Sequence, residues 1–258
     1  MNYKVSVIIP CHNEEKYISR ILYSVMMSTY NNWECVVICN ACDDDSYEIA
    51  KTYQNIDDRF VVYNYEWGGV SKARNTGIGL SSGELIMFFD ADDYIESDYI
   101  ENMVNIYDQT KEKVIRSHMY VHDKNYCFDW GIPKSGRLNV DDGLLLSNDS
   151  YDIGFCPSFI FNREIIEGIT FNEGLCMCED LCFNMEVVLK NKGLYSTDCR
   201  GYHYCMYNSG TQGNGVNAEK IIEHYNNLSN LYGENVIFRD FLLNLISRKN
   251  GNKNTQNR

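Results

Sequence analysis

The sequence lacks the features of a membrane-spanning or exported protein. No apolar run in its 258 residues approaches the ~20 residues that a transmembrane helix needs. Residues 1–4 lead directly into an apolar segment, without the charged and apolar regions of a signal peptide. We therefore expect a cytoplasmic protein.

Positive charge is also scarce. The chain has 23 Lys and Arg residues against 36 Asp and Glu residues, which gives a net charge of −13. This balance argues against non-specific binding of nucleic acid, and we expect no nucleic-acid partner. An anionic ligand would need local Lys or Arg side chains, or a metal ion, to hold it on such an acidic protein.

Eleven cysteines are present, and one group has a suggestive spacing. Cys35, Cys39 and Cys42 match the spacing of the triad that holds an iron–sulfur cluster in radical enzymes. However, residues 35–39 form an apolar run typical of a strand, whereas a cluster-binding triad needs a loop. We interpret the cysteines as reduced and mostly buried, as in other cytosolic proteins.

Apolar strands and amphipathic helices alternate through the first hundred residues. The expected strands are 5–10, 34–39, 60–65 and 85–89, and the expected helices are 14–28, 44–54, 71–80 and 97–108. Asn13 is the expected N-cap of the first helix. This order predicts an α/β fold with a mostly parallel sheet covered by helices on both faces. Ligands of such sheets bind at the carboxyl ends of the strands.

The second half has a less regular pattern. We expect strands at 114–121, 126–130, 159–161 and 195–204, and helices at 141–147, 163–167, 180–191 and 217–247. The amphipathic stretch 217–247 could pack on the core or dock on a membrane or a partner. No internal repeat and no clear linker is present, so both halves should form one compact unit.

The fourth expected strand ends abruptly in carboxylates. Side chains at positions i and i+2 of an extended segment point the same way, so Asp90 and Asp92 can converge on one ligand. At the exposed end of a buried strand they suit a hard divalent cation that carries phosphates. The alternative for an isolated Asp-x-Asp is a polar turn, which Asp93 could cap.

Five segments in register make the chain resemble a glycosyltransferase of family 2, with the GT-A fold. They are VIIPCHNEE (7–15), NACDDDS (40–46), ARNTGI (73–78), GELIMFFDADD (83–93) and EDL (179–181). The resemblance covers roughly residues 3–210. It implies a Rossmann-like, mostly parallel sheet flanked by helices, with a smaller α+β region on the acceptor side. It also implies an inverting enzyme that moves a sugar from a nucleotide-diphosphate sugar to a glycan or lipid-linked acceptor.

The resemblance implies a divalent cofactor, Mn²⁺ or Mg²⁺, bound by the Asp-x-Asp motif. In the family the last aspartate is the main metal ligand, which is Asp92 here, and the first lies near the donor ribose, which is Asp90. A metal on the diphosphate would neutralise the leaving group. In some GT-A enzymes a histidine completes the metal site, which makes His203 a candidate ligand; a structural histidine is the alternative.

The same resemblance places the nucleotide at the end of the first strand. It implies contacts to the base and ribose at Pro10 and Glu14. His12 and Asn13 close this edge, and packing is an equally good role for His12. Arg74 could fork onto a phosphate or the base, or form a surface ion pair.

Asn40 departs from the family pattern. Relatives usually carry an aspartate there, which contacts the base. An asparagine can still pair with a base edge because it both donates and accepts hydrogen bonds. A UDP-sugar is the expected donor, although this change weakens the assignment of uracil.

Asp180 is the candidate general base. Inverting transfer needs a carboxylate that takes a proton from the acceptor hydroxyl while its oxygen attacks the anomeric carbon. The family places such an acid at the start of a helix, as in Glu179-Asp180, and Glu179 would bind the acceptor or orient the loop. Ordinary helix N-terminal capping is the alternative.

We expect three regions: a nucleotide-sugar-binding half at 1–109, an acceptor-binding half at 110–215, and C-terminal helices with a polar tail at 216–258. Family precedent suggests synthesis of a bacterial surface polysaccharide at the inner face of the cell membrane. Two other functions were weighed. A phosphatase of the haloacid-dehalogenase type also ends a strand in Asp-x-Asp, but usually on its first strand. A non-catalytic relative that binds nucleotide-sugars or carbohydrate would not need both acidic motifs.

Overall fold

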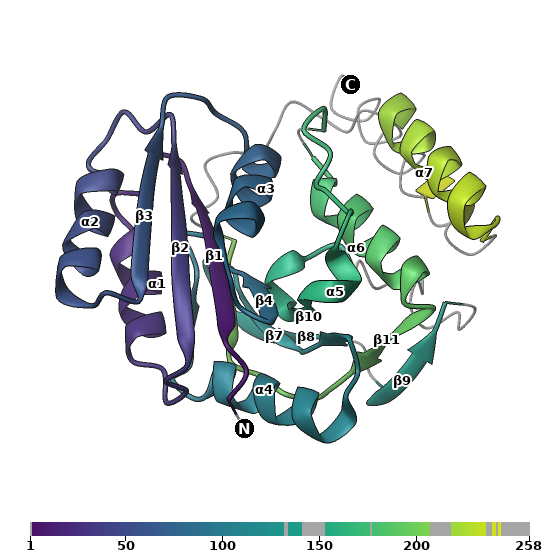
Figure 1. The fold of residues 1–258 in the computed structure, drawn as a ribbon, viewed down its shortest axis with the longest axis horizontal. Helices are drawn as coiled ribbons and strands as arrows, with labels where there is room; N and C mark the ends of the chain where they lie inside the picture. The colour runs from purple at the N-terminus through teal and green to yellow at the C-terminus, as the bar shows by residue number, and fades with distance from the viewer. Residues whose placement is uncertain are drawn as a thin grey trace.

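A computed structural model describes residues 2–131, 134–140, 153–175, 177–206, 218–235, 239–240 and 242–243. Within these residues the chain forms one large sheet and one small sheet, with helices packed around them (Figure 1). This arrangement agrees with the predicted α/β class. No helix in these ranges is both long and apolar enough to cross a lipid bilayer.

The first half of the chain builds the parallel part of the large sheet. Its strands are β1 (Val5–Cys11), β2 (Trp33–Asn40), β3 (Phe60–Tyr65) and β4 (Leu85–Phe88), in the order β3-β2-β1-β4. They alternate with α1 (Ile18–Met26), α2 (Ser46–Ile56) and α3 (Val70–Leu80), and α4 (Tyr99–Thr110) follows. The predicted strands match to within one or two residues, because each is a continuous apolar run that ends in polar residues.

The second half extends the same sheet beyond β4. The added strands are β10 (Phe159–Asn162), β6 (Val114–Arg116), β11 (Gly193–Ser196) and β9 (Gly136–Asn139), in that spatial order. Strand β10 runs antiparallel to both of its neighbours, β4 and β6. The sheet therefore has eight strands and passes without a break from one half of the chain to the other.

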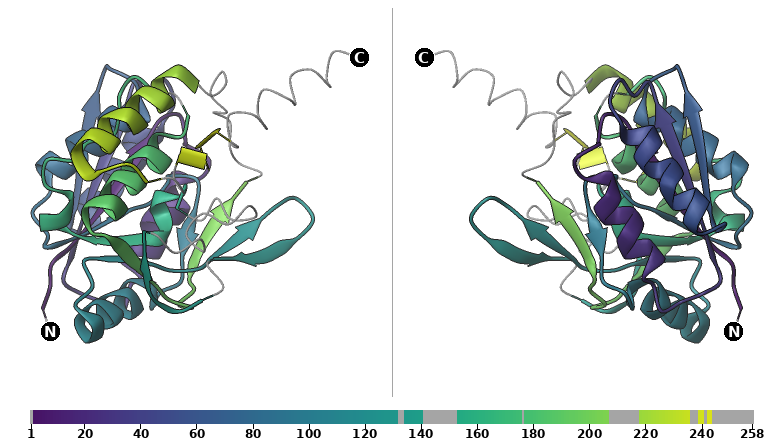
Figure 2. Two further views of the ribbon diagram at one scale, coloured as in Figure 1. Left: turned by 90° about the vertical axis from the view of Figure 1, so that its right-hand side faces the viewer. Right: turned by 90° about the vertical axis from the view of Figure 1, so that its left-hand side faces the viewer.

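A second sheet carries the strands β5 (Tyr94–Ile95), β12 (Tyr202–Cys205), β7 (Met119–His122) and β8 (Cys127–Trp130), in that order. The hairpin of β7 and β8 projects from the body of the molecule (Figure 2). The predictions of single strands at 114–121 and 195–204 were wrong, since each stretch divides between the two sheets. The first stretch divides at His118, whose backbone N–H donates to the carbonyl of Cys199 instead of to a neighbouring strand.

Alternating residues of the central strands face two apolar layers. Ile8 and Phe88 point to the layer that holds α5 (Arg163–Ile166), α6 (Glu179–Lys190) and α7 (Ala218–Tyr232). Val7 and Ile9 point to the opposite layer, with α1, α2 and α4. Burial on both faces explains why these strands are apolar throughout rather than alternating.

The predicted start of the first helix was wrong, and one other predicted helix lies outside the described residues. The first helix begins at Ile18, not at residue 14, and Asn13 is not its N-cap. Asn13 instead adopts a left-handed conformation (φ 58°) in the preceding turn, which asparagine tolerates better than most residues. The helix expected at 141–147 lies outside the described residues.

The amphipathic C-terminal stretch contributes to the core. Helix α7 buries Ile221, Tyr225 and Leu228 in the same apolar layer as α6. Of the two roles expected for this stretch, the structure thus shows core packing for α7. Much of 233–258 lies outside the described residues.

Candidate active site

The predicted site residues gather where β1, β2 and β4 end. Pro10 lies next to the last residue of β1, and Asn40 is the last residue of β2. Asp90 and Asp92 follow β4 in the turn before β5. Because β1 is hydrogen-bonded to both β2 and β4, these three strand ends lie side by side (Figure 1). This is the sheet edge at which ligands were expected.

Arg74 connects the acidic turn to the acidic pair on α6. One terminal guanidinium nitrogen lies 3.0 Å from Asp90 Oδ1, and the other lies 3.0 Å from Glu179 Oε1. The Arg74 side chain is 3% exposed and lies over the ring of Phe171. Burial alone would lower the pKa of Arg74, but the carboxylates of Asp90 and Asp180 outweigh it and raise the pKa. The surface ion pair considered for Arg74 is therefore not what the structure shows.

Helix α3 is fastened to the loop before α6 by a residue next to Arg74. Asn75 donates from Nδ2 to the carbonyl of Phe171 at 2.9 Å and accepts from the Phe171 N–H at 2.8 Å. Ser71 Oγ donates to the carbonyl of Asn172. Asn75 belongs to the motif at 73–78, but the sequence predicts no role for it because its partner, Phe171, is 96 positions away in the chain.

Several carboxylates lie close together at this edge, and the pKa values of Asp92 and Glu14 are raised. Burial and then the neighbouring Asp90 raise the pKa of Asp92 to about 6. Burial, followed by Asp92 and Asp44, raises the pKa of Glu14 to about 7. Like charges held together in this way favour either protonation or a cation between them. The oxygen donors of Asp90 and Asp92 fit a hard divalent ion, which prefers carboxylates.

The pKa of Asp180, the candidate base, is strongly raised. It lies in the first turn of α6, and burial together with Glu179 raises its pKa to about 8, against the opposing effect of Arg74. The N-cap of α6 is Cys178, and no side chain caps this helix by a hydrogen bond. Asp180 therefore does not cap α6 by a hydrogen bond, although its place in the first turn is favourable to the helix dipole.

Asp93 links the acidic turn to the second sheet. This fully buried side chain accepts hydrogen bonds from the Cys205 N–H at 2.7 Å and from the Tyr202 hydroxyl. The Tyr202 oxygen in turn accepts from the Asp90 N–H at 3.1 Å. Asp93 thus positions the turn through β12 rather than capping it locally.

His203 lies on β12, and both of its ring nitrogens are engaged. Nδ1 is 2.8 Å from Nε2 of His122, and Nε2 is 3.3 Å from Glu96 Oε1. The ring stacks on Tyr94 at 4.2 Å between centroids. Metal ligation by His203 stays a prediction, and it would require one of these contacts to open.

Arg20 is a site residue that sequence reasoning missed. It projects from α1, donates to the backbone carbonyl of Asp92, and lies 5.0 Å from the centroid of Tyr94. Its charge lowers the pKa of Asp92, against burial and Asp90. Nothing in the spacing of α1 distinguishes Arg20 from an ordinary surface arginine.

The base-side loops are tied to one another. His12 Nδ1 lies 2.8 Å from the carbonyl oxygen of Asn40, and Asn13 Oδ1 accepts from the Asp43 N–H at 2.8 Å. The side-chain amide of the buried Asn40 lies 2.8 Å from the Cys11 carbonyl and 3.1 Å from the Gly69 N–H, and with its nitrogen turned toward that carbonyl it donates to the first and accepts from the second. The contacts expected between these side chains and a base stay predictions.

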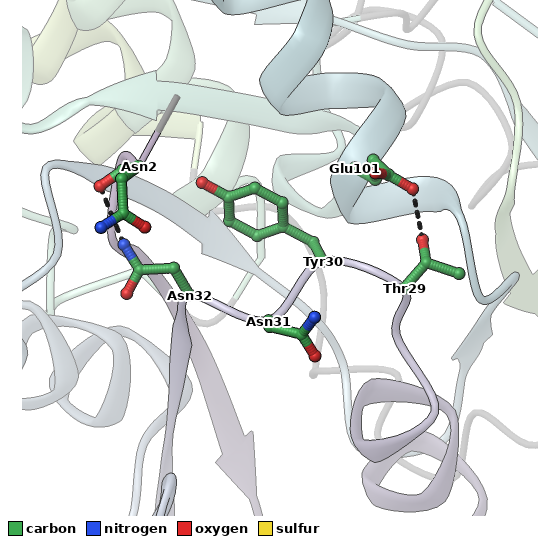
Figure 3. Close-up of a pocket in the computed structure, with 6 residues that line it drawn as sticks. All are labelled: Asn2, Thr29, Tyr30, Asn31, Asn32 and Glu101. Atoms are coloured by element: carbon green, nitrogen blue, oxygen red, sulfur yellow. Dashed lines mark hydrogen bonds between the residues drawn. The ribbon is translucent and has the colours of Figure 1, made fainter.

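A separate pocket lies at the other end of the strands. It is lined by residues that precede β1 and β2 and by one residue of α4: Asn2, Thr29, Tyr30, Asn31, Asn32 and Glu101 (Figure 3). None of the predicted site residues lines it, and the acidic turn lies at the opposite edge of the sheet.

Known proteins resemble this chain in sequence and in structure. Glycosyltransferase GlyA of Streptococcus pneumoniae is 41% identical over 210 residues, covering 75% of this chain and 30% of GlyA. TarS of Staphylococcus aureus, a poly(ribitol-phosphate) β-N-acetylglucosaminyltransferase, is 26% identical and covers 80% of this chain, which spans 36% of TarS. The chain thus spans about a third of the length of these two relatives.

Solved structures share the fold. Residues 1–349 of S. aureus TarS, in complex with UDP-GlcNAc, superpose with a TM-score of 0.77 at 23% identity, covering 88% of this chain and 65% of that one. A mannosyltransferase from Pyrobaculum calidifontis, in complex with GDP-Man and Mn²⁺, gives a TM-score of 0.64 at 16% identity, covering 94% and 68%. The family model for glycosyl transferase family 2 matches residues 6–170, well over half of the chain. The chain therefore belongs to glycosyl transferase family 2.

Proposed function

We propose that the protein is a metal-dependent inverting glycosyltransferase that uses a nucleotide-diphosphate sugar. The observation that carries this proposal is the double contact of Arg74, which joins Asp90 of the acidic turn to Glu179 beside Asp180. Arg74 thereby joins the carboxylate turn that is proposed to bind the metal and diphosphate to the helix that carries the proposed base, Asp180. A UDP-sugar is the proposed donor, in keeping with the UDP-GlcNAc complex of TarS.

Asp92 and Asp90 would hold Mn²⁺ or Mg²⁺, with His203 as the third ligand. The metal would offset the charge that develops on the diphosphate as it leaves. Support comes from the raised pKa of Asp92, which reflects the burial of its carboxylate and, after that, the negative charge of the neighbouring Asp90. The solved structure of the mannosyltransferase that shares the fold is a complex with GDP-Man and Mn²⁺.

Asp180 is the proposed general base. It would accept the proton of the acceptor hydroxyl while that oxygen forms a bond to the anomeric carbon and the bond to the diphosphate breaks. A pKa of about 8 makes its carboxylate more basic than an ordinary aspartate. Glu179, held by Arg74, would orient this loop or bind the acceptor.

The loops after β1 and β2 would bind the nucleoside. Pro10 and Glu14 are proposed to contact the base and ribose, and His12, Asn13 and Asn40 to lie beside them. These five residues form the proposed nucleoside wall. In this proposal residues 1–109 bind the donor, 110–215 bind the acceptor, and 216–258 form the C-terminal helices and tail. The acceptor would be a glycan or lipid-linked glycan of the bacterial surface, reached at the cytoplasmic face of the membrane.

Ligand binding tests the proposal, because a ligand that binds only the folded state raises the melting temperature. We expect a UDP-sugar with Mn²⁺ to stabilise the wild-type protein, and Asp92→Ala to lose the Mn²⁺-dependent part. Asp58→Ala, at an exposed position far from this edge, serves as the control. Donor affinity like the wild type in Asp92→Ala would remove the metal assignment. Binding without transfer to any of a broad set of acceptors would favour a non-catalytic relative.

A further inference from the structure

Three cysteines meet beside the proposed nucleoside wall. Cys11 is the last residue of β1, Cys39 lies near the end of β2, and Cys42 lies in the loop that follows. Their Sγ atoms all lie within 4.8 Å of one another. We propose that these three thiols form a binding site for one thiophilic metal ion of the Zn²⁺ or Cu⁺ class, separate from the carboxylate site and beyond the proposed glycosyl transfer.

The fold itself brings the three sulfurs together. Cys11 and Cys39 are register partners in the parallel pair of β1 and β2, so their side chains lie on the same face of the sheet. Ala41 adopts a left-handed conformation (φ 51°) and turns the chain back. This turn places Cys42 Sγ 3.5 Å from the carbonyl oxygen of Cys11.

The spacing of the sulfurs suits a small soft ion. A Zn–S bond of about 2.3 Å in tetrahedral geometry separates two sulfurs by about 3.8 Å. Sulfurs already within 4.8 Å need only small side-chain adjustments to reach that geometry. Thiolates select Zn²⁺ and Cu⁺, whereas carboxylates select Mg²⁺ and Mn²⁺, so the two sites would not compete for one ion.

Burial provides both shielding and access. Cys11 and Cys39 are buried, while Cys42 is partly exposed and opens the group to solvent. Binding would replace three S–H protons by three metal–sulfur bonds and release the protons to solvent. It would also fasten the end of β1 to the loop after β2, in which the Asp43 N–H donates to Asn13 of the loop after β1.

The grouping differs from the one that sequence spacing suggested. Cys35 lies near the start of β2, in a strand as expected. It does not belong to the cluster. Cys11, from another strand, takes its place. No spacing along the chain could reveal this, because the contact depends on the pairing of β1 with β2.

Metal titration of the full, reduced chain tests the proposal. We expect one Co²⁺ per chain to produce a thiolate-to-cobalt charge-transfer absorption, and Zn²⁺ or Cu⁺, added anaerobically, to displace it. Mn²⁺ should not displace it. Cys42→Ser should weaken binding at least tenfold, and Cys42→Ala should do the same if the serine variant folds poorly. Cys199→Ser is the matched control, because Cys199 is also partly exposed and its Sγ also lies 3.5 Å from a backbone carbonyl.

The absence of a thiolate band in the reduced wild type would overturn the proposal. So would unchanged affinity in Cys42→Ser, or an equal loss in Cys199→Ser. Asp92→Ala separates this proposal from the catalytic one: it should abolish the Mn²⁺-dependent donor effect and leave the cobalt band intact. Displacement by only one of Zn²⁺ and Cu⁺ would identify the ion within the proposed class.

Discussion

Arg74 and Glu179 lie 105 positions apart in the sequence and are joined by a buried hydrogen-bonded ion pair of 3.0 Å. The same guanidinium reaches Asp90 with its other terminal nitrogen. A planar fork is needed to contact two carboxylates in different directions, and a lysine ammonium cannot reproduce it. The geometry of the site therefore depends on this arginine and not merely on its charge.

We expect Arg74→Lys to keep the charge but lose one of the two contacts. Breaking one partner of a buried pair costs about 3–5 kcal/mol, and misplacing reacting groups by about 1 Å can cost on the order of 100-fold in rate. Both kcat/KM and the melting temperature should fall. Arg239→Lys is the control, because Arg239 also contacts two carboxylates, those of Glu234 and Asp240, but at a far more exposed position, and it should change neither by much. Near-normal turnover in Arg74→Lys would argue against a positioning role.

The raised pKa of Asp180 makes a pH prediction with a definite sign. At a pH below its pKa of about 8 the carboxyl of Asp180 is mostly protonated and cannot accept a proton. The value of kcat/KM should therefore rise with pH up to about 8. Asp180→Asn should lower kcat by about 10²–10⁴-fold while retaining donor binding. The exposed Asp198→Asn is the control. An Asp180→Asn enzyme with the wild-type pH profile would exclude Asp180 as the base.

Helix α3 approaches β1 so closely that Gly77 has no room for a side chain. A Cβ at Gly77 would lie 2.3 Å from Cγ2 of Ile8, whereas a Cβ at Gly79 would meet nothing within 4 Å. Gly77→Ala should therefore destabilise the protein by about 1–3 kcal/mol through overpacking. Gly79→Ala should stabilise it by about 0.5–1 kcal/mol, because alanine is the better helix former. Urea unfolding of both variants measures the contrast, and equal effects would contradict it.

The carboxylate of Glu34 predicts acid sensitivity at the other end of the strands. Burial alone would raise its pKa, but hydrogen bonds from Lys4 and Ser6 lower it from 4.5 to about 2. The stabilisation is therefore complete above about pH 4.5 and is lost as the pH falls toward 2. The stability difference between wild type and Glu34→Gln, measured by urea unfolding, should shrink over that range. A difference that does not vary with pH would show that charge is not involved.

The order of strands and helices in the first half could be predicted because local signals and burial agree there. Strand β3 was predicted to the residue, and β4 to within one. The errors lie where tertiary contacts decide. Residues 114–121 read as one strand, yet the chain leaves the large sheet at His118 to start the second.

The site was predictable where motifs carry it and not where packing does. Asp90, Asp92 and Arg74 come together as the motifs suggested. Arg20 was missed, and the role of Asp93 was not foreseen, because both depend on contacts with distant segments. The place of Cys11 beside Cys39 and Cys42 could not be predicted for the same reason.

The place of β10 between β4 and β6 determines what a shortened protein would do. A fragment ending near residue 109 would contain every residue of the proposed donor half, yet the backbone hydrogen-bonding groups on one side of β4 would be left unpaired. Exposed apolar edges of this kind pair with other copies of the chain and promote aggregation. Donor binding should therefore be studied in the intact chain, because the edge of β4 in the donor half is covered by β10 from the second half.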